Sequence, residues 1–182
     1  MKISTSQLLD ELKILTQQHI RCAENLLQET EEKLNFRASE NSWSALECLE
    51  HLNRYGDFYI PEITLSISSS KTSPKYTFKP GILGNYFTKM MLPKEKLNKM
   101  KTVKSMNPIH SQLNKNTVNV FIKQQHQFLE LLEKARKADL EKVKTGISIS
   151  KLLKLRLGDT LRFVIYHNER HIKQAETVLT NF

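Results

Sequence analysis

The 182 residues are enough to bury one substantial hydrophobic core, and we expect a single domain that spans residues 1–182. With 39% apolar residues, 26% charged residues and only 5 glycines and 5 prolines, the composition fits a helical globular protein better than a disordered or sheet-rich one. The net charge of +9 raises nucleic acid or an anionic membrane as partners, depending on where the charge lies along the chain.

The sequence contains no window that approaches the roughly 20 apolar residues needed to span a bilayer. Its start also lacks the apolar stretch of a secretory signal. Cys22 and Cys48 both fall in apolar helical stretches, where small buried thiols are more common than disulfides. These features predict a cytoplasmic protein without a transmembrane segment.

Residues 4–34 carry apolar side chains at steps of three and four residues, which is the spacing of one helix face. The pattern predicts a long amphipathic helix that ends in the polar stretch 35–42. A second helix is expected to begin after Ser44 and to run to about residue 68. Its start has the S-x-x-E form of a capping box, in which the Ser44 hydroxyl and the Glu47 carboxylate bind backbone amides. Trp43, just before it, is expected to staple the helix start.

The helical pattern fails in the predicted crossover insert, residues 69–116, apart from one short helix expected at about residues 85–92. Residues 71–104 contain nine lysines, no arginine and one acidic residue, so most of the excess charge lies here. Lysine without arginine is a poor match to the fork recognition of phosphates and bases, which disfavours nucleic acid as a partner. We interpret the insert as a solvated, Lys-rich lid. Its interleaved aromatic residues keep binding to nucleic acid or anionic lipid open as the alternative: Tyr76, Phe78, Tyr86 and Phe87.

Helical periodicity returns at Val118 and fades in the Lys-rich stretch before Gly146, which predicts a third helix. A fourth helix is expected to follow, capped by Asp159 after Gly158. Helices joined by short links tend to be antiparallel, whereas the long insert allows the second and third to run parallel. The sequence therefore predicts an all-α, up-down-down-up four-helix bundle.

Three histidines are candidates for a metal site. His167 and His171 are four residues apart on the fourth predicted helix, so both rings project from one face. His51 lies at helical spacing from Cys48 and Tyr55 on the second helix and should also point inward. Helix bundles build metal sites from side chains on facing helices. Two packed or surface histidines are the alternative interpretation of the pair alone.

Two segments resemble a known family. Residues 43–52, WSALECLEHL, resemble the W-S-x-x-E-x-x-x-H-L signature of the DinB-like (DinB/YfiT-like) superfamily, and residues 163–174, FVIYHNERHIKQ, resemble its H-x-x-R-H-x-x-Q segment. The resemblance implies a four-helix bundle in which His51, His167 and His171 are the ligands of one metal ion. It also implies either a thiol-dependent transferase or a metal-dependent hydrolase.

Residues beside the histidines supply the catalytic candidates, Glu47 and Arg170. Glu47 lies one turn before His51, where it could orient that ligand or act as a general base, although the capping box already explains it. Arg170 and Gln174 match the family segment, and Arg170 could bind a substrate carboxylate or form a structural ion pair.

The other histidines are expected to have structural roles. His19 lies on the apolar face of the first helix and is interpreted as a hydrogen-bonded core residue, with a position in the metal site as the alternative. His110 in the insert and His126 on the third helix are expected to be structural or exposed.

The sequence favours a metalloenzyme that holds one divalent ion, with Zn or Ni preferred and Fe or Cu as alternatives, because all four accept imidazole ligands. The expected partner is a small-molecule substrate, including a low-molecular-weight thiol, and a homodimer stays open. The alternative is a non-catalytic binding module in which the metal is structural or absent and the basic insert contacts an anionic partner.

Overall fold

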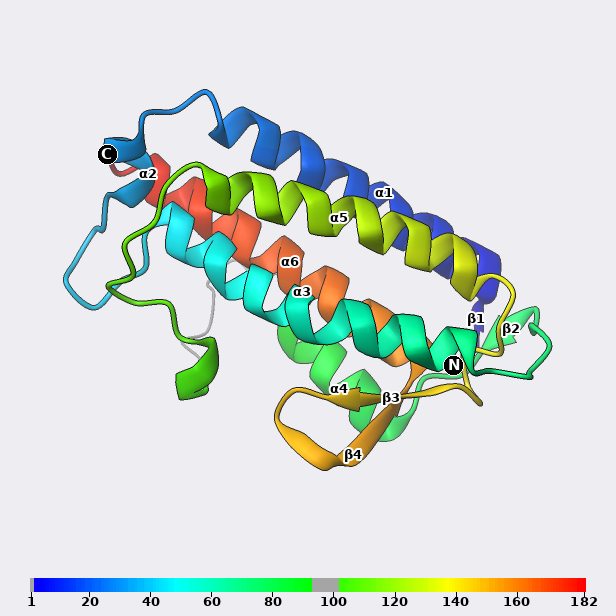
Figure 1. Ribbon diagram of the computed structural model, residues 1–182. Coiled ribbons are helices and arrows are strands. Elements are labelled where there is room, and N and C mark those ends of the chain that lie inside the picture. The colour runs from blue at the N-terminus through cyan, green and yellow to red at the C-terminus, as the bar shows by residue number, and fades with distance from the viewer. Residues whose placement is uncertain (1, 93–101) are drawn as a thin grey trace.

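The computed structural model describes residues 2–92 and 102–182, so residues 93–101 of the predicted insert lie outside it. Four long helices dominate the described chain (Figure 1): α1 (Thr5–Leu26), α3 (Ala45–Ser68), α5 (Asn116–Ala135) and α6 (Leu157–Leu179). The shorter elements are α2 (Glu31–Asn35), α4 (Ile82–Met91), the 3-10 turn η1 (Lys104–Met106), β1 (Ile3–Ser4), β2 (Thr77–Phe78), β3 (Lys144–Ile147) and β4 (Ser150–Arg156). The all-α prediction is confirmed. None of the helices in the described ranges has the length and apolar character to cross a membrane.

The long helices form a bundle in which α1 and α6 run in one direction and α3 and α5 in the other (Figure 1). One hydrophobic cluster joins Leu9 and Leu161, near the starts of α1 and α6, to Tyr59 and Leu132, near the ends of α3 and α5. A second cluster joins the opposite ends of the same four helices. This is the up-down-down-up order that the sequence predicted. Both α1 and α3 contact α5 and α6, so α1 and α3 lie across a diagonal of the bundle.

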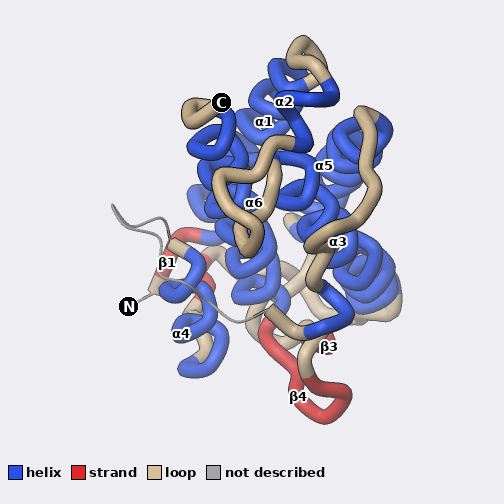
Figure 2. The backbone as a smooth tube through the Cα atoms, turned by 90° about the vertical axis from the view of Figure 1, so that its left-hand side faces the viewer, coloured by secondary structure: helices blue, strands red, loops and turns tan. Residues whose placement is uncertain are grey.

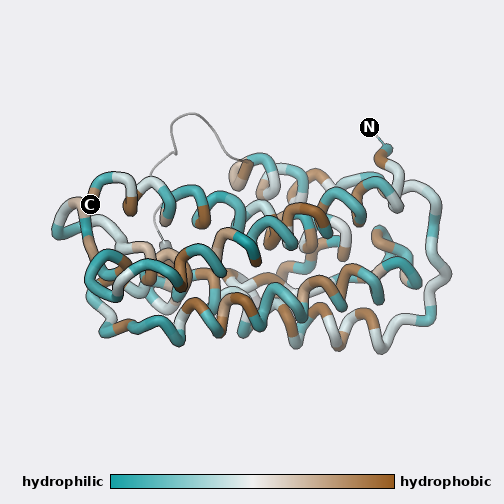
Figure 3. The backbone as a smooth tube through the Cα atoms, turned by 90° about the horizontal axis from the view of Figure 1, so that it is seen from above, coloured by the Kyte–Doolittle hydropathy of each residue, from teal (hydrophilic) through white to brown (hydrophobic). Residues whose placement is uncertain are grey.

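Amphipathic periodicity explains the core. Figure 3 shows hydrophobic and hydrophilic residues alternating along the long helices at roughly one-turn spacing, as burial of one helix face requires. The predicted capping box is present, because the Ser44 hydroxyl accepts from the Glu47 amide and the Glu47 carboxylate accepts from the Ser44 amide. The first predicted helix is divided in the structure. α1 ends at Leu26, and Thr30 then caps the separate short helix α2.

The segment between α5 and α6 contains a β-hairpin that the sequence did not predict. β3 and β4 pair antiparallel, with Thr145 opposite Leu155. The prediction that Asp159 caps the fourth helix is wrong, because α6 begins at Leu157. The Asp159 carboxylate instead accepts a hydrogen bond from the Gly81 amide at the start of α4, 2.8 Å away. Asp159 therefore ties the insert to α6.

The insert is only in part the solvated lid that the sequence predicted. The short helix is confirmed as α4, which packs on α6 and begins earlier than expected. Phe78 is fully buried in the bundle core, with its ring against Gly158, where a β-carbon would come within 2.7 Å of it. Tyr76 and Tyr86 are exposed. A core residue of the bundle thus comes from the insert.

Candidate metal centre

His51 on α3 and His167 and His171 on α6 converge between these two helices. Each offers a ring nitrogen, and these nitrogens all lie within 4.8 Å of one another. The Nε2 atoms of His51 and His167 are 3.2 Å apart. Two imidazole nitrogens that share an ion at about 2.1 Å in tetrahedral geometry lie about 3.4 Å apart, so this spacing suits a shared ion. All three side chains are buried. The convergence of the triad that the sequence predicted is present.

Two of the three rings have a hydrogen-bond partner that fixes the position of their proton. Nδ1 of His51 donates to the backbone carbonyl of Met106, 2.6 Å away in η1. Nδ1 of His171 donates to Oε1 of Gln174, 2.9 Å away and one turn further along α6. A neutral imidazole that donates through Nδ1 has its lone pair on Nε2. Both rings therefore present an Nε2 lone pair to the centre of the triad.

Burial keeps the triad neutral. Removal from water lowers the pKa of His51 to about 4, and it also lowers the pKa of His167 and His171 well below the usual value. Each protonated ring would repel its neighbours as well. Neutral imidazole is the form that binds a metal ion, so the environment favours the ligand state at neutral pH.

The arrangement fits a divalent metal ion. Without an ion or a proton between them, Nε2 lone pairs on His51 and His167 would repel each other at 3.2 Å. A cation between the two nitrogens would bind both lone pairs. Nδ1 of His167 is buried without a hydrogen-bond partner in the described part of the chain. The described residues add no Cys, Asp or Glu to the triad. Three neutral imidazoles would therefore leave the charge of the ion uncompensated.

A cavity of about 870 Å³ opens beside the triad. Its walls come mainly from α3, α4, α6 and the β3–β4 hairpin. The ring of Tyr55 is tilted against that of His167, with ring centroids 4.6 Å apart, and the ring centroid of Trp43 lies 4.7 Å from that of His51. The cavity is therefore mostly aromatic and aliphatic close to the triad. Further apolar walls are formed by Tyr59, Phe87, Met90, Met91, Val103 and Phe163.

The catalytic candidates have different surroundings. Glu47 is fully buried and its carboxylate accepts from Arg37 through both oxygens, at 2.9 and 2.7 Å, and from the Ser44 and His110 amides. Burial alone would raise the pKa of Glu47, but these donors outweigh it and hold the pKa below the usual value. Glu47 is absent from the cavity lining. Arg170 is buried, lines the cavity, and has its pKa lowered by burial.

The remaining histidines lie outside the triad. His19 is buried and its Nε2 lies 2.9 Å from the Glu169 carboxylate, which is the hydrogen-bonded core role that the sequence predicted. His110 and His126 are exposed, and His110 has a positive φ of 62° in the turn after Pro108.

Sequence reasoning missed the partners that orient the triad and the residues that enclose it. The Met106 carbonyl carries no side-chain signal and is brought to His51 by the chain turning back in η1. The spacing of Tyr55 from His51 was used only to predict that His51 points inward, although the same spacing of four places the Tyr55 ring beside that of His51. Gln174 was noted only as a match to the family segment, although it follows His171 by three residues, a spacing that places both side chains on one helix face.

The fold and the triad define the class of protein, which is a four-helix bundle with a buried three-histidine cluster between its second and last long helices. A family model described as the DinB superfamily matches residues 12–175, so the chain belongs to the DinB superfamily. No curated protein and no solved structure matches the chain.

Proposed function

We propose that this protein is a metal-dependent transferase that joins a low-molecular-weight thiol to an electrophilic carbon, with His51, His167 and His171 as the ligands of one divalent metal ion. The observation that carries the proposal is the buried triad, whose ring nitrogens lie within 4.8 Å of one another beside a cavity of about 870 Å³. Imidazole ligands suit Zn, Ni, Fe and Cu. We propose Zn or Ni as the bound ion and keep Fe and Cu as the alternatives.

His51, His167 and His171 would hold the ion as neutral ligands, and its uncompensated charge would make a thiol or water nucleophilic near neutral pH. The chain's own contribution is to hold the ligands ready. Met106 and Gln174 keep the protons of His51 and His171 on Nδ1, so that Nε2 of each ring carries the lone pair available to an ion. Burial keeps all three rings neutral.

The cavity walls support an apolar electrophile as the second substrate. Aromatic and aliphatic side chains bind apolar groups and exclude water, which protects a thiolate nucleophile from proton donors. In the transfer, the bond from sulfur to carbon forms while the bond from that carbon to its leaving group breaks. The thiol proton passes to solvent. We place this reaction in the cytoplasm, where free thiols such as those of Cys22 and Cys48 persist.

The test is an assay of protein purified without a His-tag and loaded with a stated metal. One panel uses small thiols with chlorodinitrobenzene, and a second uses esters and amides. The blank is His167→Ala, and His126→Ala is the matched control because His126 is exposed on α5. Thiol-dependent turnover in wild type and His126→Ala, but not in His167→Ala, supports the proposal. Turnover confined to the second panel makes the protein a hydrolase. Equal rates in wild type and blank across both panels favour the non-catalytic binding module.

A further inference from the structure

The side of the molecule formed by α4 and the β3–β4 hairpin combines exposed apolar side chains with lysines. In Figures 1 and 2 both elements lie on the same side of the four long helices, and α4 contacts β4. Ile82 on α4 and Leu152 on β4 are 95% and 94% exposed. Both side chains leave almost all of their apolar surface in contact with water, so a partner that covers them would gain free energy.

The periodicity of each element sets apolar and basic residues side by side. On α4, Gly84 and Thr88 face α6, whereas Ile82, Tyr86 and Lys89 stand at steps of four and three on the opposite, exposed face. On β4, side chains alternate between the two faces, so Leu152 and Lys154 share the face opposite the buried Leu155. We name seven of the exposed residues of α4, β4 and the segment 142–144 the basic apolar face: Ile82, Tyr86, Lys89, Lys142, Lys144, Leu152 and Lys154.

The charge of this face has one sign. Residues 71–92 contain four lysines and residues 142–156 contain five basic residues, and neither segment contains an acidic residue. Lys75 and Arg156 form ion pairs with Asp139 and Glu141. In the described ranges no ion pair engages Lys89, Lys142 or Lys154. Their charge is available to a partner.

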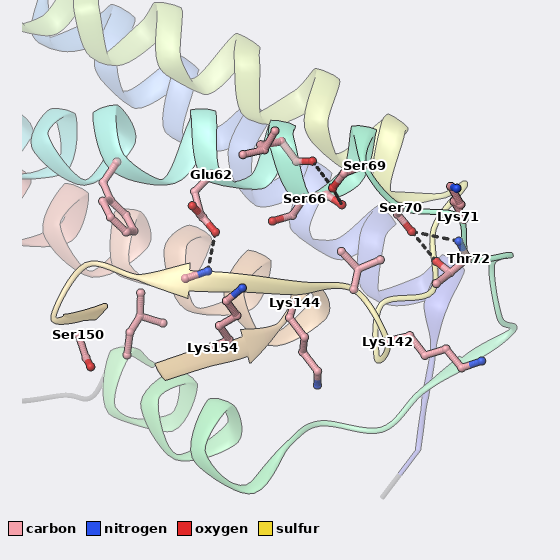
Figure 4. A pocket seen from close by; sticks show the side chains of 15 residues that line it. Glu62, Ser66, Ser69, Ser70, Lys71, Thr72, Lys142, Lys144, Ser150 and Lys154 are labelled. Carbon is pink, nitrogen blue, oxygen red and sulfur yellow. Dashed lines mark hydrogen bonds between the residues drawn. The ribbon is translucent and has the colours of Figure 1, made fainter. Parts of the chain in front are cut away.

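Three lysines of the basic apolar face, Lys142, Lys144 and Lys154, also line a recess beneath the hairpin. A second cavity, of about 630 Å³, lies between the end of α3 and β3. Figure 4 shows the amino groups of Lys142, Lys144 and Lys154 apart from one another, with Lys144 directed away from α3 and Lys154 toward β3, so they do not converge on one small anion. The Glu62 carboxylate in this recess is bound by the Gly146 amide. The lysines therefore suit an extended anionic surface better than one small ligand.

We propose that the basic apolar face docks on an anionic lipid membrane. A second copy of the chain would bring lysines against lysines, which like-charge repulsion opposes. Nucleic acid offers phosphates but nothing that covers Ile82 and Leu152, and residues 71–104 lack the arginines that recognise phosphate as a fork. A bilayer surface with acidic headgroups accepts both features, because aliphatic side chains enter the acyl boundary while lysines remain at the headgroups.

The proposal stands independently of the metal chemistry, although the two surfaces share their elements. Phe87 and Met91 of α4 and Ile147 and Leu155 of the hairpin line the cavity beside the triad. Docking through the outer side of these elements would therefore place the cavity walls next to the lipid.

The test is co-sedimentation of the full chain with vesicles of phosphatidylcholine, alone or mixed with phosphatidylglycerol. We expect binding to the mixed vesicles only, weakened by added salt. Replacing two lysines in Lys89→Gln/Lys154→Gln should lower the partition coefficient about fivefold for each lysine. Ile82→Glu/Leu152→Glu should lower it by roughly tenfold or more.

The matched control is Ile14→Glu, which introduces a charge at an exposed aliphatic residue of α1, a helix that packs mainly on α5 and α6 in the described chain. Circular dichroism verifies that each variant is folded, and the lysine variant keeps the test decisive if the apolar variant unfolds. Equal binding to both vesicle types, or equal loss in Ile14→Glu and Ile82→Glu/Leu152→Glu, would overturn the proposal. So would tight binding to a single-stranded oligonucleotide without vesicle binding, or dimers in sedimentation that only the face variants dissociate.

Discussion

His51 and His167 lie 116 residues apart in the sequence and face each other with Nε2 atoms 3.2 Å apart. The proton of His51 is on Nδ1, which donates it to the Met106 carbonyl, so Nε2 of His51 carries a lone pair. Either Nε2 of His167 donates a proton to this lone pair, or a cation lies between the two nitrogens and binds both. A proton there leaves the Nδ1 lone pair of His167 buried without a partner. A shared cation uses both Nε2 lone pairs as ligands.

We expect His51→Ala and His167→Ala each to abolish retention of metal. Loss of either ligand leaves two imidazoles, and the remaining donors hold an ion far less tightly. The measurement is metal content by mass spectrometry after dialysis, together with the rise in melting temperature on adding metal. A metal ion whose free concentration is about 1,000 times its Kd for the native protein adds about 4 kcal/mol to the free energy of unfolding. The melting temperature of the wild type should therefore rise clearly. His126→Ala is the control and should behave as wild type. Metal retained equally by all three variants would place the ion elsewhere.

Gln174 should position His171 rather than bind metal. Gln174→Leu removes the acceptor for Nδ1 of His171 and frees that ring to rotate, so metal affinity should fall about 10- to 100-fold. Gln174→Glu keeps an acceptor oxygen and should restore most of the affinity. Isothermal titration with Zn or Ni measures both. If the Leu and Glu variants bind equally well, the hydrogen bond has no orienting role.

The bundle could be predicted because apolar residues recur at helical spacing along each long helix. This pattern placed the four helices, and the Ser44 and Glu47 pair marked the beginning of α3, which the structure confirms. The triad could be predicted because His51, His167 and His171 stand at helical spacing on those faces. Helix direction followed from the lengths of the links.

The parts that the sequence did not predict are those with short or non-local patterns. β3 has four residues and is held by pairing with β4, so its alternation is too brief to separate from a loop. Phe78 is a single aromatic residue among lysines and prolines, and its burial depends on the space beside Gly158 some 80 positions later. Asp159 has the character of a helix cap, but the amide that it binds belongs to Gly81.

The buried position of Phe78 gives a direct test of the insert. Phe78→Ala should lower the free energy of unfolding by about 3–5 kcal/mol, since it empties a core site shared by β2 and the start of α6. Tyr76→Ala, two residues away and 97% exposed, should change it by less than about 0.5 kcal/mol. Urea titration followed by circular dichroism measures both. Removal of residues 71–104 should consequently destabilise the bundle rather than leave it intact. A Phe78→Ala variant as stable as Tyr76→Ala would restore the interpretation of the insert as a lid.

The last prediction concerns Glu47, whose buried carboxylate joins the start of α3 to Arg37 and to the turn at His110. Its pKa in the folded protein lies below the usual value, so the unfolded chain binds the proton more readily. The stability that Glu47 contributes is therefore fully present above about pH 4.5 and is lost as the pH falls through the lower folded pKa. Glu47→Gln should cost about 2–3 kcal/mol at neutral pH, because charge-assisted hydrogen bonds are lost.

The cost of Glu47→Gln should shrink as the pH is lowered below about 4.5, since the wild-type carboxyl then becomes neutral as well. The control is Glu50→Gln, one turn away within the same helix, whose partly exposed ion pair with Arg54 should contribute less than about 1 kcal/mol. Urea midpoints for the three proteins between neutral and acid pH measure the difference. Metal content should stay at the wild-type level in Glu47→Gln, because the carboxylate is outside the triad. A pH-independent cost would show that the charge of Glu47 is not what stabilises the helix start, and loss of metal would give Glu47 a role at the site itself.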